Sequence, residues 1–358
     1  MRHPASDAQE AIRDAAAELF GRLVDPTRIE KVEATADRFD RELWSAIGEA
    51  GLLGVAVSED DGGLGLGTAE LALLLEQHGR AVAPVPLVDT TLAAWAIAQH
   101  GSAEQRSTWL ARLVAGHATA AIALPSSTSD VRLDDQRLGG TAVGVPWAHV
   151  ADVLLLFVND RVVLVHPGGG GVATVREETT ARTVALTVEF ADVDAEVLGG
   201  DGTADWLLTR ARTAWSAVQA GVTDAAVRMT ASYTSEREQF GKPLSTFQSV
   251  ALKAADAYLD ATAIRATAFA AADALDSGND ASLESLTAAW WAAEAGQHCV
   301  HLTQHLHGGM GADVTYPVHR YFLWAKQIEL MLGGASALLA ELGETLDEHP
   351  DLGDVVVL

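Results

Sequence analysis

Apolar residues recur at intervals of three and four over most of the first 118 residues, which is the spacing of amphipathic α-helices. The pattern is clearest in LWSAIGEAG, AELALLLEQHG and EQRSTWLARLVAG, and each of these segments stops at a glycine, a common helix end. SEDDGGLGLG, residues 58–67, lies between the first two segments and predicts a loop. We therefore expect an N-terminal helical domain over residues 1–118.

The apolar period changes to that of β-strands at about residue 119. AAIAL, DVLLLFV and RVVLV are short apolar runs, and TVALTVEF places Val184, Leu186, Val188 and Phe190 on one face. Glycines at positions 199, 200 and 202 close the region. The pattern predicts a middle β-domain over residues 119–202.

Helical spacing returns at Trp206 and persists almost to the end of the chain. One predicted helix carries an apolar face made of Phe247, Val250, Ala254, Ala257, Ala261 and Ile264. Long helices with such faces pack as antiparallel bundles, so residues 203–358 predict a four-helix bundle. The last 18 residues hold six acidic residues and no Lys or Arg, and predict a solvated acidic tail. The fold class is therefore mainly α with a small β-domain.

Composition narrows the class of partner. The chain has 358 residues and a formal net charge of −25, which argues against binding to nucleic acid or to an anionic membrane. Every long apolar run is broken by a charge, such as Asp152 or Glu294, so no membrane span is expected. The N-terminus lacks the apolar core of a secretory signal, and the single Cys299 excludes an internal disulfide. We expect a cytoplasmic protein.

The element order restricts how a nucleotide cofactor could bind. Doubly wound nucleotide-binding folds alternate strand and helix along the chain, whereas this chain runs from helices to a β-domain to a helical bundle. No Gly-rich fingerprint stands between a predicted strand and a predicted helix. Any nucleotide-bearing cofactor must therefore bind by another route.

Several local sequences resemble the acyl-CoA dehydrogenases, flavoproteins with this order of three domains. YTSEREQFGKPLSTFQ is similar to the Arg-x-x-Phe-Gly segment of the family followed by Phe-Gln, and HLHGGMGADVTYPVHR is similar to its Gly-Gly-x-Gly loop with a later Tyr-Pro. EAGLLGVAVSEDDGGLGLG and GSAEQRSTWLARLVAG resemble segments of its first domain. The resemblance covers nearly the whole chain and rests on the joint order and spacing of these pieces.

The resemblance implies α,β-dehydrogenation of an acyl-CoA thioester, in which a glutamate removes the α-proton and FAD accepts the β-hydride. In most of the family that glutamate lies sixteen residues after the Tyr of Tyr-Pro, which is Leu332 here. In a minority it lies 29 residues before the Phe of Arg-x-x-Phe-Gly, which is Ala211 here. Neither residue can accept a proton, so the catalytic base is predicted to be absent. Glu329, one helical turn from Leu332, is the alternative base.

The flavin-facing segments of the β-domain also depart from the family. A segment resembling Thr-Glu-Pro-x-Ala-Gly-Ser-Asp reads ALPSSTSD here, over residues 123–130, and has lost the Thr-Glu pair. The later Trp-Ile-Thr positions fall on Gly144, Val145 and Pro146. We therefore expect that this β-domain does not hold a flavin ring.

The family's other FAD contacts are retained. In the family each FAD lies across a dimer interface, and one chain supplies its Arg-x-x-Phe-Gly segment, the following Gln and the Gly-Gly loop. The resemblance places cofactor-binding roles on Arg237, Phe240, Gln248, His305, Gly308 and Gly309, with His305 where Gln is commoner. Arg237 could make charge-assisted hydrogen bonds to the pyrophosphate, and the glycines would let the dinucleotide approach the backbone.

The combination of a missing base with retained FAD contacts resembles the β-type subunits of actinobacterial α₂β₂ acyl-CoA dehydrogenases that act on steroid side chains. It implies half of a shared FAD site, with a catalytic α-type subunit as partner and no catalytic residue in this chain. A tetramer of that kind would hold two FAD rather than four. The implied substrate is an acyl-CoA, with a steroid side-chain CoA as one possibility, and the implied electron acceptor is an electron-transferring flavoprotein.

Other interpretations remain open at this stage. The chain could be a self-sufficient homo-oligomeric flavoenzyme that uses Glu329, or a family member that binds an acyl-CoA or a protein without redox chemistry. Arg237 could be a surface cap, and the glycine loop could be only a helix end. His298, His301 and His305 share one helix face, but no carboxylate of that helix shares their register, so we interpret them as core or interface residues. Arg212 matches an arginine near the family's substrate pocket, and we assign it no role.

Overall fold

The computed structural model describes residues 6–125 and 129–348, and it divides into two compact units, residues 1–211 and 212–358. The division into three domains at 118 and 202 stays a prediction. Among the described residues, no helix is long and apolar enough to cross a membrane.

The first unit begins with six helices among its described residues, and three of them overlap the segments named from the sequence pattern. The six are α1 (Asp7–Leu23), α2 (Pro26–Glu33), α3 (Arg41–Glu49), α4 (Thr68–Ala81), α5 (Leu87–His100) and α6 (Ala103–Val114). Side chains of Ser6, Asp25, Asp40 and Ser102 accept hydrogen bonds at four of the helix starts, as N-caps do. Two short 3₁₀ turns, η1 (Leu52–Gly54) and η2 (Glu59–Asp61), lie between α3 and α4, and η2 is within the predicted loop.

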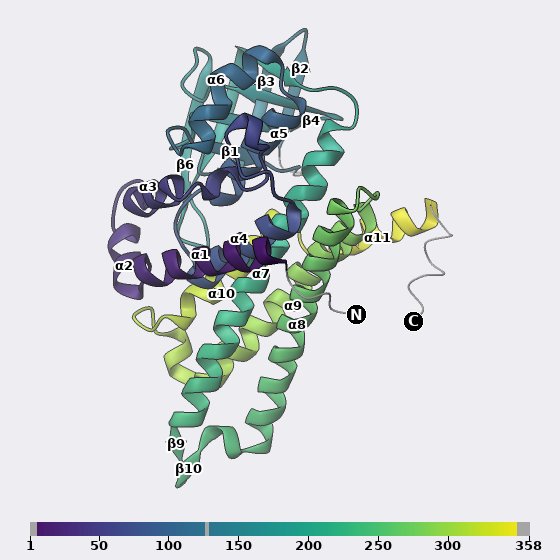
Figure 1. Cartoon of the computed structure of the whole chain (residues 1–358). Helices are drawn as coiled ribbons and strands as arrows, with labels where there is room; N and C mark the ends of the chain where they lie inside the picture. The colour runs from purple at the N-terminus through teal and green to yellow at the C-terminus, as the bar shows by residue number, and fades with distance from the viewer. Residues whose placement is uncertain (1–5, 126–128, 349–358) are drawn as a thin grey trace. The chain divides into compact units, whose positions relative to one another are not determined.

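Two four-stranded sheets follow in the same unit (Figure 1). The first has the order β1 (Ala120–Ala123), β4 (Val153–Val158), β5 (Arg161–Val165), β8 (Glu196–Leu198). The second has the order β2 (Asp130–Asp134), β3 (Arg137–Pro146), β7 (Val184–Asp194), β6 (Val172–Glu178). All pairings are antiparallel except that of β1 with β4. In β7 the predicted apolar face, Val184 to Phe190, is buried.

Helix α5 covers the outer edge of β1. The Ala120 backbone N–H donates to Thr90 Oγ1 over 3.1 Å, and the Ile122 N–H donates to Asp89 Oδ1 over 3.0 Å. These contacts satisfy donors that an edge strand otherwise leaves open. Burial raises the pKa of Asp89 to about 7, and the hydrogen bond from Ile122 opposes part of that rise.

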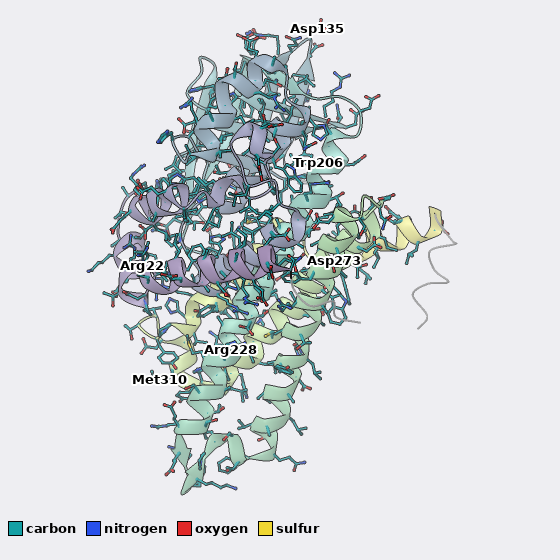
Figure 2. All side chains as sticks on the ribbon, viewed as in Figure 1. Arg22, Asp135, Trp206, Arg228, Asp273 and Met310 are labelled. Atoms are coloured by element: carbon teal, nitrogen blue, oxygen red, sulfur yellow. The ribbon has the colours of Figure 1, made fainter. Side chains whose placement is uncertain are left out.

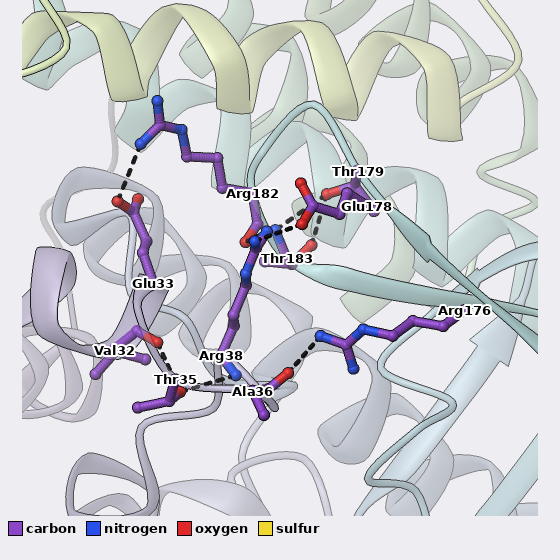
Figure 3. Close-up of polar contacts among 10 residues, drawn as sticks. All are labelled: Val32, Glu33, Thr35, Ala36, Arg38, Arg176, Glu178, Thr179, Arg182 and Thr183. Carbon is purple, nitrogen blue, oxygen red and sulfur yellow. Dashed lines mark hydrogen bonds and ion pairs between the residues drawn. The ribbon is translucent and has the colours of Figure 1, made fainter.

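Arginines join the segment after α2 to the loop between β6 and β7 (Figure 3). Arg38 donates to the Arg182 carbonyl oxygen over 3.1 Å and pairs with Glu178 over 2.6 Å. Arg182 in turn pairs with Glu33 over 3.5 Å, and Arg176 donates to the Ala36 carbonyl. The helical and β-parts of the first unit are therefore linked by polar contacts as well as by apolar packing.

The second unit is helical. Helix α7 (Thr203–Glu236) runs from the first unit into it, and α8 (Gln248–Asp276), α9 (Ser282–Leu306), α10 (Val318–Met331) and α11 (Ala335–Glu348) follow. A hairpin of β9 (Glu238–Gln239) and β10 (Lys242–Pro243) connects α7 to α8 at their shared end (Figure 1). Ala257 and Ala261 of α8 pack against Cys299 of α9, as the apolar face predicts.

The acidic tail departs from expectation. Its first eight residues, 341–348, belong to helix α11, although residues 341–347 are exposed or half-buried. Leu338 in the first turns of α11 is 2% exposed, and Glu341 Oε2 lies 2.6 Å from Arg212 Nη2. A buried apolar anchor and an ion pair therefore hold a helix that charge counting alone does not reveal. Residues 349–358 lie outside the described part of the chain.

Candidate functional site

The predicted cofactor residues begin at the end of α7, where the chain turns sharply. Phe240 and Gly241 both adopt the left-handed region, with φ of 54° and 79°, and the Leu244 N–H donates to the Arg237 carbonyl over 2.8 Å. Glycine tolerates this backbone, whereas phenylalanine adopts it at a cost of about 1 kcal/mol or more. The turn holds Phe240 92% exposed and leaves Arg237 exposed as well.

The same turn continues into the first residue of α8. The rings of Phe240 and Phe247 meet edge to face at 6.3 Å, and Lys242 Nζ lies 4.3 Å from the centre of the Phe247 ring. Gln248 follows as the exposed first residue of α8, and no side chain caps this helix start. An uncapped helix N-terminus presents backbone N–H groups and a partial positive charge, which favour an anion.

The second set of predicted residues lies after α9, in the 3₁₀ turn η4 (Gly308–Ala312). A Cβ atom added at Gly308 or Gly309 would meet nothing within 4 Å, whereas one at Gly311 would lie 2.3 Å from the Gln304 carbonyl oxygen. The first two glycines therefore border open space and the third is required for packing. Met310, which lies between Gly309 and Gly311 and is labelled in Figure 2, is 41% exposed.

Aromatic stacking joins these two sets. Tyr233 on α7 stacks on His307 with ring centroids 4.6 Å apart, and Tyr316 lies against the same imidazole at 5.3 Å. His307 is buried, its Nδ1 lies 2.8 Å from the Thr303 carbonyl, and burial lowers its pKa. Because Tyr233 is one turn before Arg237, and His307 directly precedes Gly308, the stack brings the two predicted segments to one end of the bundle.

A polar contact makes a second connection. Lys253 Nζ, on the second turn of α8, lies 2.9 Å from His305 Nε2 in the last turn of α9. The sequence reasoning missed Tyr233, His307 and Lys253. Helical spacing is a signal for Tyr233 alone, since Tyr233 precedes Arg237 by four residues, whereas Lys253 follows Gln248 by five and does not share its helix face.

The group of predicted residues fits the phosphates of an anionic dinucleotide such as FAD. Between Arg237 and Lys253 the chain carries three basic residues and one acidic residue, although it is strongly acidic as a whole. The helix start at Gln248 presents backbone N–H donors, and no side chain covers the backbone at Gly308 and Gly309. These features support anion binding by positive charge and by backbone groups together.

The residues at the two expected base positions are apolar and buried. Ala211 is 1% exposed and Leu332 is 8% exposed. Glu329, the alternative base, accepts from Lys326 Nζ at 2.7 Å. Arg212 is likewise engaged by Glu341. The carboxylate of Glu329 is therefore already engaged in an ion pair within the chain.

The segments that would face a flavin ring are engaged in local contacts. Gly144 has a φ of 66° and lies at an irregularity of the β3–β7 pairing, so a larger residue there would be strained. Ser129 Oγ accepts from the Val143 N–H over 3.1 Å, and Asp130 pairs with Arg132 over 2.6 Å. Residues 126–128 of ALPSSTSD lie outside the described part of the chain.

The three histidines on one face of α9 have separate partners. His298 Nδ1 lies 2.7 Å from Asp260 Oδ2, His301 meets the Phe322 ring edge to face at 4.8 Å, and His305 contacts Lys253. Within residues 6–125 and 129–348, no group of three or more His, Cys, Asp or Glu side chains is arranged to hold a metal ion.

A helical N-terminal region, two small sheets and a helical bundle, in that order, define the acyl-CoA dehydrogenase fold. Residues 6–117 match the family's N-terminal domain and residues 189–344 match its C-terminal domain. The chain belongs to the acyl-CoA dehydrogenase family. It is 37% identical over 365 residues to the acyl-CoA dehydrogenase FadE27 of Mycobacterium tuberculosis, covering 94% of this chain and 98% of that protein.

Solved structures give the same assignment and add a point about assembly. The fold is similar to that of the Tcur3481-Tcur3483 steroid ACAD, with a TM-score of 0.91, 42% identity and coverage of 96% of this chain and 98% of the other. It is also similar to the ChsE4-ChsE5 complex from Mycobacterium tuberculosis, with a TM-score of 0.91, 34% identity and coverage of 98% and 100%. Each of these structures is named for a pair of proteins.

Proposed function

We propose that this chain is the non-catalytic β-type subunit of an α₂β₂ acyl-CoA dehydrogenase and supplies half of a shared FAD site. The observation that carries the proposal is a contrast within the chain. Both expected positions of the catalytic glutamate are buried apolar residues, Ala211 and Leu332, whereas the residues expected to contact the cofactor cluster at one exposed end of the bundle.

In this proposal each chemical role belongs to a defined chain. Arg237, Gln248 and the Gly308-Gly309 backbone bind the phosphates and orient the dinucleotide, and the exposed Phe240 shields it from water. FAD supplies the hydride acceptor when it is bound. The α-type subunit supplies the glutamate and the wall behind the flavin ring, because Gly144, Val145 and Pro146 here offer neither an aromatic ring nor a hydroxyl.

The substrate of the complex is an acyl-CoA thioester. We propose a steroid side-chain CoA, since a similar protein pair is described as a steroid ACAD, and an electron-transferring flavoprotein as the electron acceptor. This chain does not supply the base for the reaction: Glu329 is held by Lys326, and Arg212 by Glu341.

The first experiment is the visible spectrum and native mass of the chain, purified alone and together with a family member that retains the glutamate. A colourless chain that forms a yellow heterotetramer, with about half a FAD per chain, is the expected result. A chain that is yellow alone, with one FAD per chain and turnover of an acyl-CoA, would falsify the proposal.

A second experiment addresses the homo-oligomeric alternative directly. If Glu329 were the base, Glu329→Gln would abolish turnover by any active sample. We expect the variant complex to keep its rate, because the side chain is already paired with Lys326. The matched change is Glu→Gln at the catalytic position of the α-type subunit, which should eliminate activity.

A further inference from the structure

A basic side chain outside the predicted set lies beside it. Lys253 Nζ is 2.9 Å from His305 Nε2, and the two residues come from different helices, α8 and α9. His305 occupies a position expected to contact FAD, and it is exposed. Lys253 therefore lies one side chain away from the proposed cofactor site.

The contact determines which nitrogen of His305 carries the hydrogen. A lysine ammonium has three donors and no acceptor, so Nε2 must be the acceptor and must be unprotonated. A neutral imidazole then carries its hydrogen on Nδ1. Without a donor opposite Nε2, the ring could carry the hydrogen on either nitrogen.

The charge of residues 237–253 indicates that a ligand beside Lys253 would be an anion. Residues 237–253 include three basic residues, Arg237, Lys242 and Lys253, and one acidic residue, Glu238, in a chain with 49 acidic and 24 basic residues. Lys242 Nζ is positioned over the Phe247 ring, whereas Lys253 Nζ is directed to the histidine. A phosphate needs donors and positive charge, and this arrangement supplies both.

We propose that Lys253 is a positioning residue of the FAD site. Its ammonium group holds His305 as the Nδ1–H tautomer, which serves the FAD pyrophosphate as a hydrogen-bond donor in place of an amide. Its positive charge also adds to that of Arg237. This inference rests on the proposed function, since it assumes that FAD binds at this end of the bundle.

The test uses the complex with the catalytic subunit, stripped of flavin and titrated with FAD. Lys253→Met should weaken FAD binding by roughly tenfold, which corresponds to about 1.4 kcal/mol, and Lys253→Arg should retain most of the affinity because it keeps a donor and a charge. Arg265→Met is the control, since it removes a positive charge on the same helix about 18 Å away. It should leave the affinity unchanged.

A second readout reports on the tautomer without any flavin. In the same complex labelled with ¹³C and ¹⁵N histidine, the His305 ring shifts should be those of the Nδ1–H form and should move towards the Nε2–H form in Lys253→Met. Unchanged His305 shifts in that variant would overturn the positioning role.

Failure of the inference is separable from failure of the proposed function. If Arg237→Ala releases FAD and Lys253→Met does not, only the role of Lys253 is wrong. If neither variant changes FAD binding, the cofactor does not bind at this end of the bundle, and both proposals are rejected.

Discussion

Asp89 is a single residue whose charge state affects the stability of the whole first unit. Its carboxyl is 3% exposed and accepts from the Ile122 N–H, and burial raises its pKa to about 7. In the unfolded chain its pKa is about 3.9. The folded state therefore retains a proton between these values that the unfolded state has lost.

The buried carboxyl of Asp89 makes the free energy of unfolding depend on pH. This group favours folding fully below about pH 4, and its contribution falls by about 1.4 kcal/mol per pH unit until about pH 7. Asp89→Asn should keep the acceptor for Ile122 and remove that slope, which urea unfolding at a series of pH values would measure. Asp134→Asn, at an exposed position of β2, is the control. A variant at position 89 with the wild-type slope would contradict the assignment.

Gly309 and Gly311 are expected to have different roles, the first in ligand binding and the second in packing. Gly311→Ala should lower the free energy of unfolding by about 1–3 kcal/mol, because the new Cβ meets the Gln304 carbonyl at 2.3 Å. Gly309→Ala should leave stability unchanged, since its Cβ enters open space, but should weaken FAD retention in the complex. Thermal unfolding and flavin content of both variants check this. A Gly309→Ala variant that loses stability together with flavin would mean that Gly309 is only structural.

At the scale of elements, helix α11 has one buried side chain among residues 335–347, besides the ion pair of Glu341 with Arg212. Leu338 is 2% exposed, whereas its neighbour Leu339 is 53% exposed. Leu338→Ala should cost about 2–4 kcal/mol, and Leu339→Ala should change stability by less than about 0.5 kcal/mol. Hydrogen exchange of the α11 amides would show whether the loss is local. Similar effects from the two leucines would mean that α11 does not pack as described.

The helices and strands were predictable because their apolar periods are regular, as Val184 to Phe190 and Ala257 to Ile264 show. The end of helix α11 was predicted as a tail because acidic residues dominate positions 341–358, and the pairing of Glu341 with Arg212 cannot be inferred from charge counts. Motif spacing also predicts Arg237, Gln248 and Gly308 as cofactor contacts, and that role stays a prediction. It could not identify Tyr233 or His307, because their stacking depends on how α7 and α9 meet.

At the scale of the whole molecule, net charge dominates the effect of salt. We expect the self-repulsion that a charge of −25 produces in the folded chain to exceed the gain from its scattered surface ion pairs. Raising NaCl from about 20 mM to about 300 mM shortens the screening length from roughly 20 Å to roughly 6 Å. The urea midpoint should therefore rise. A fall would mean that ion pairs such as Arg38–Glu178 contribute more than repulsion.

Trypsin cleavage in the hairpin between α7 and α8 should differ between the isolated chain and an assembled complex. Trypsin can cut after Arg237 in that exposed turn, but Lys242 is followed by Pro243, a bond that trypsin leaves intact. The isolated chain should therefore be nicked at one bond of this turn. If a partner and a dinucleotide cover the turn, trypsin should no longer cut there. The cleavage fragments on a gel would then report whether the proposed shared site is occupied, before flavin absorbance or activity is measured.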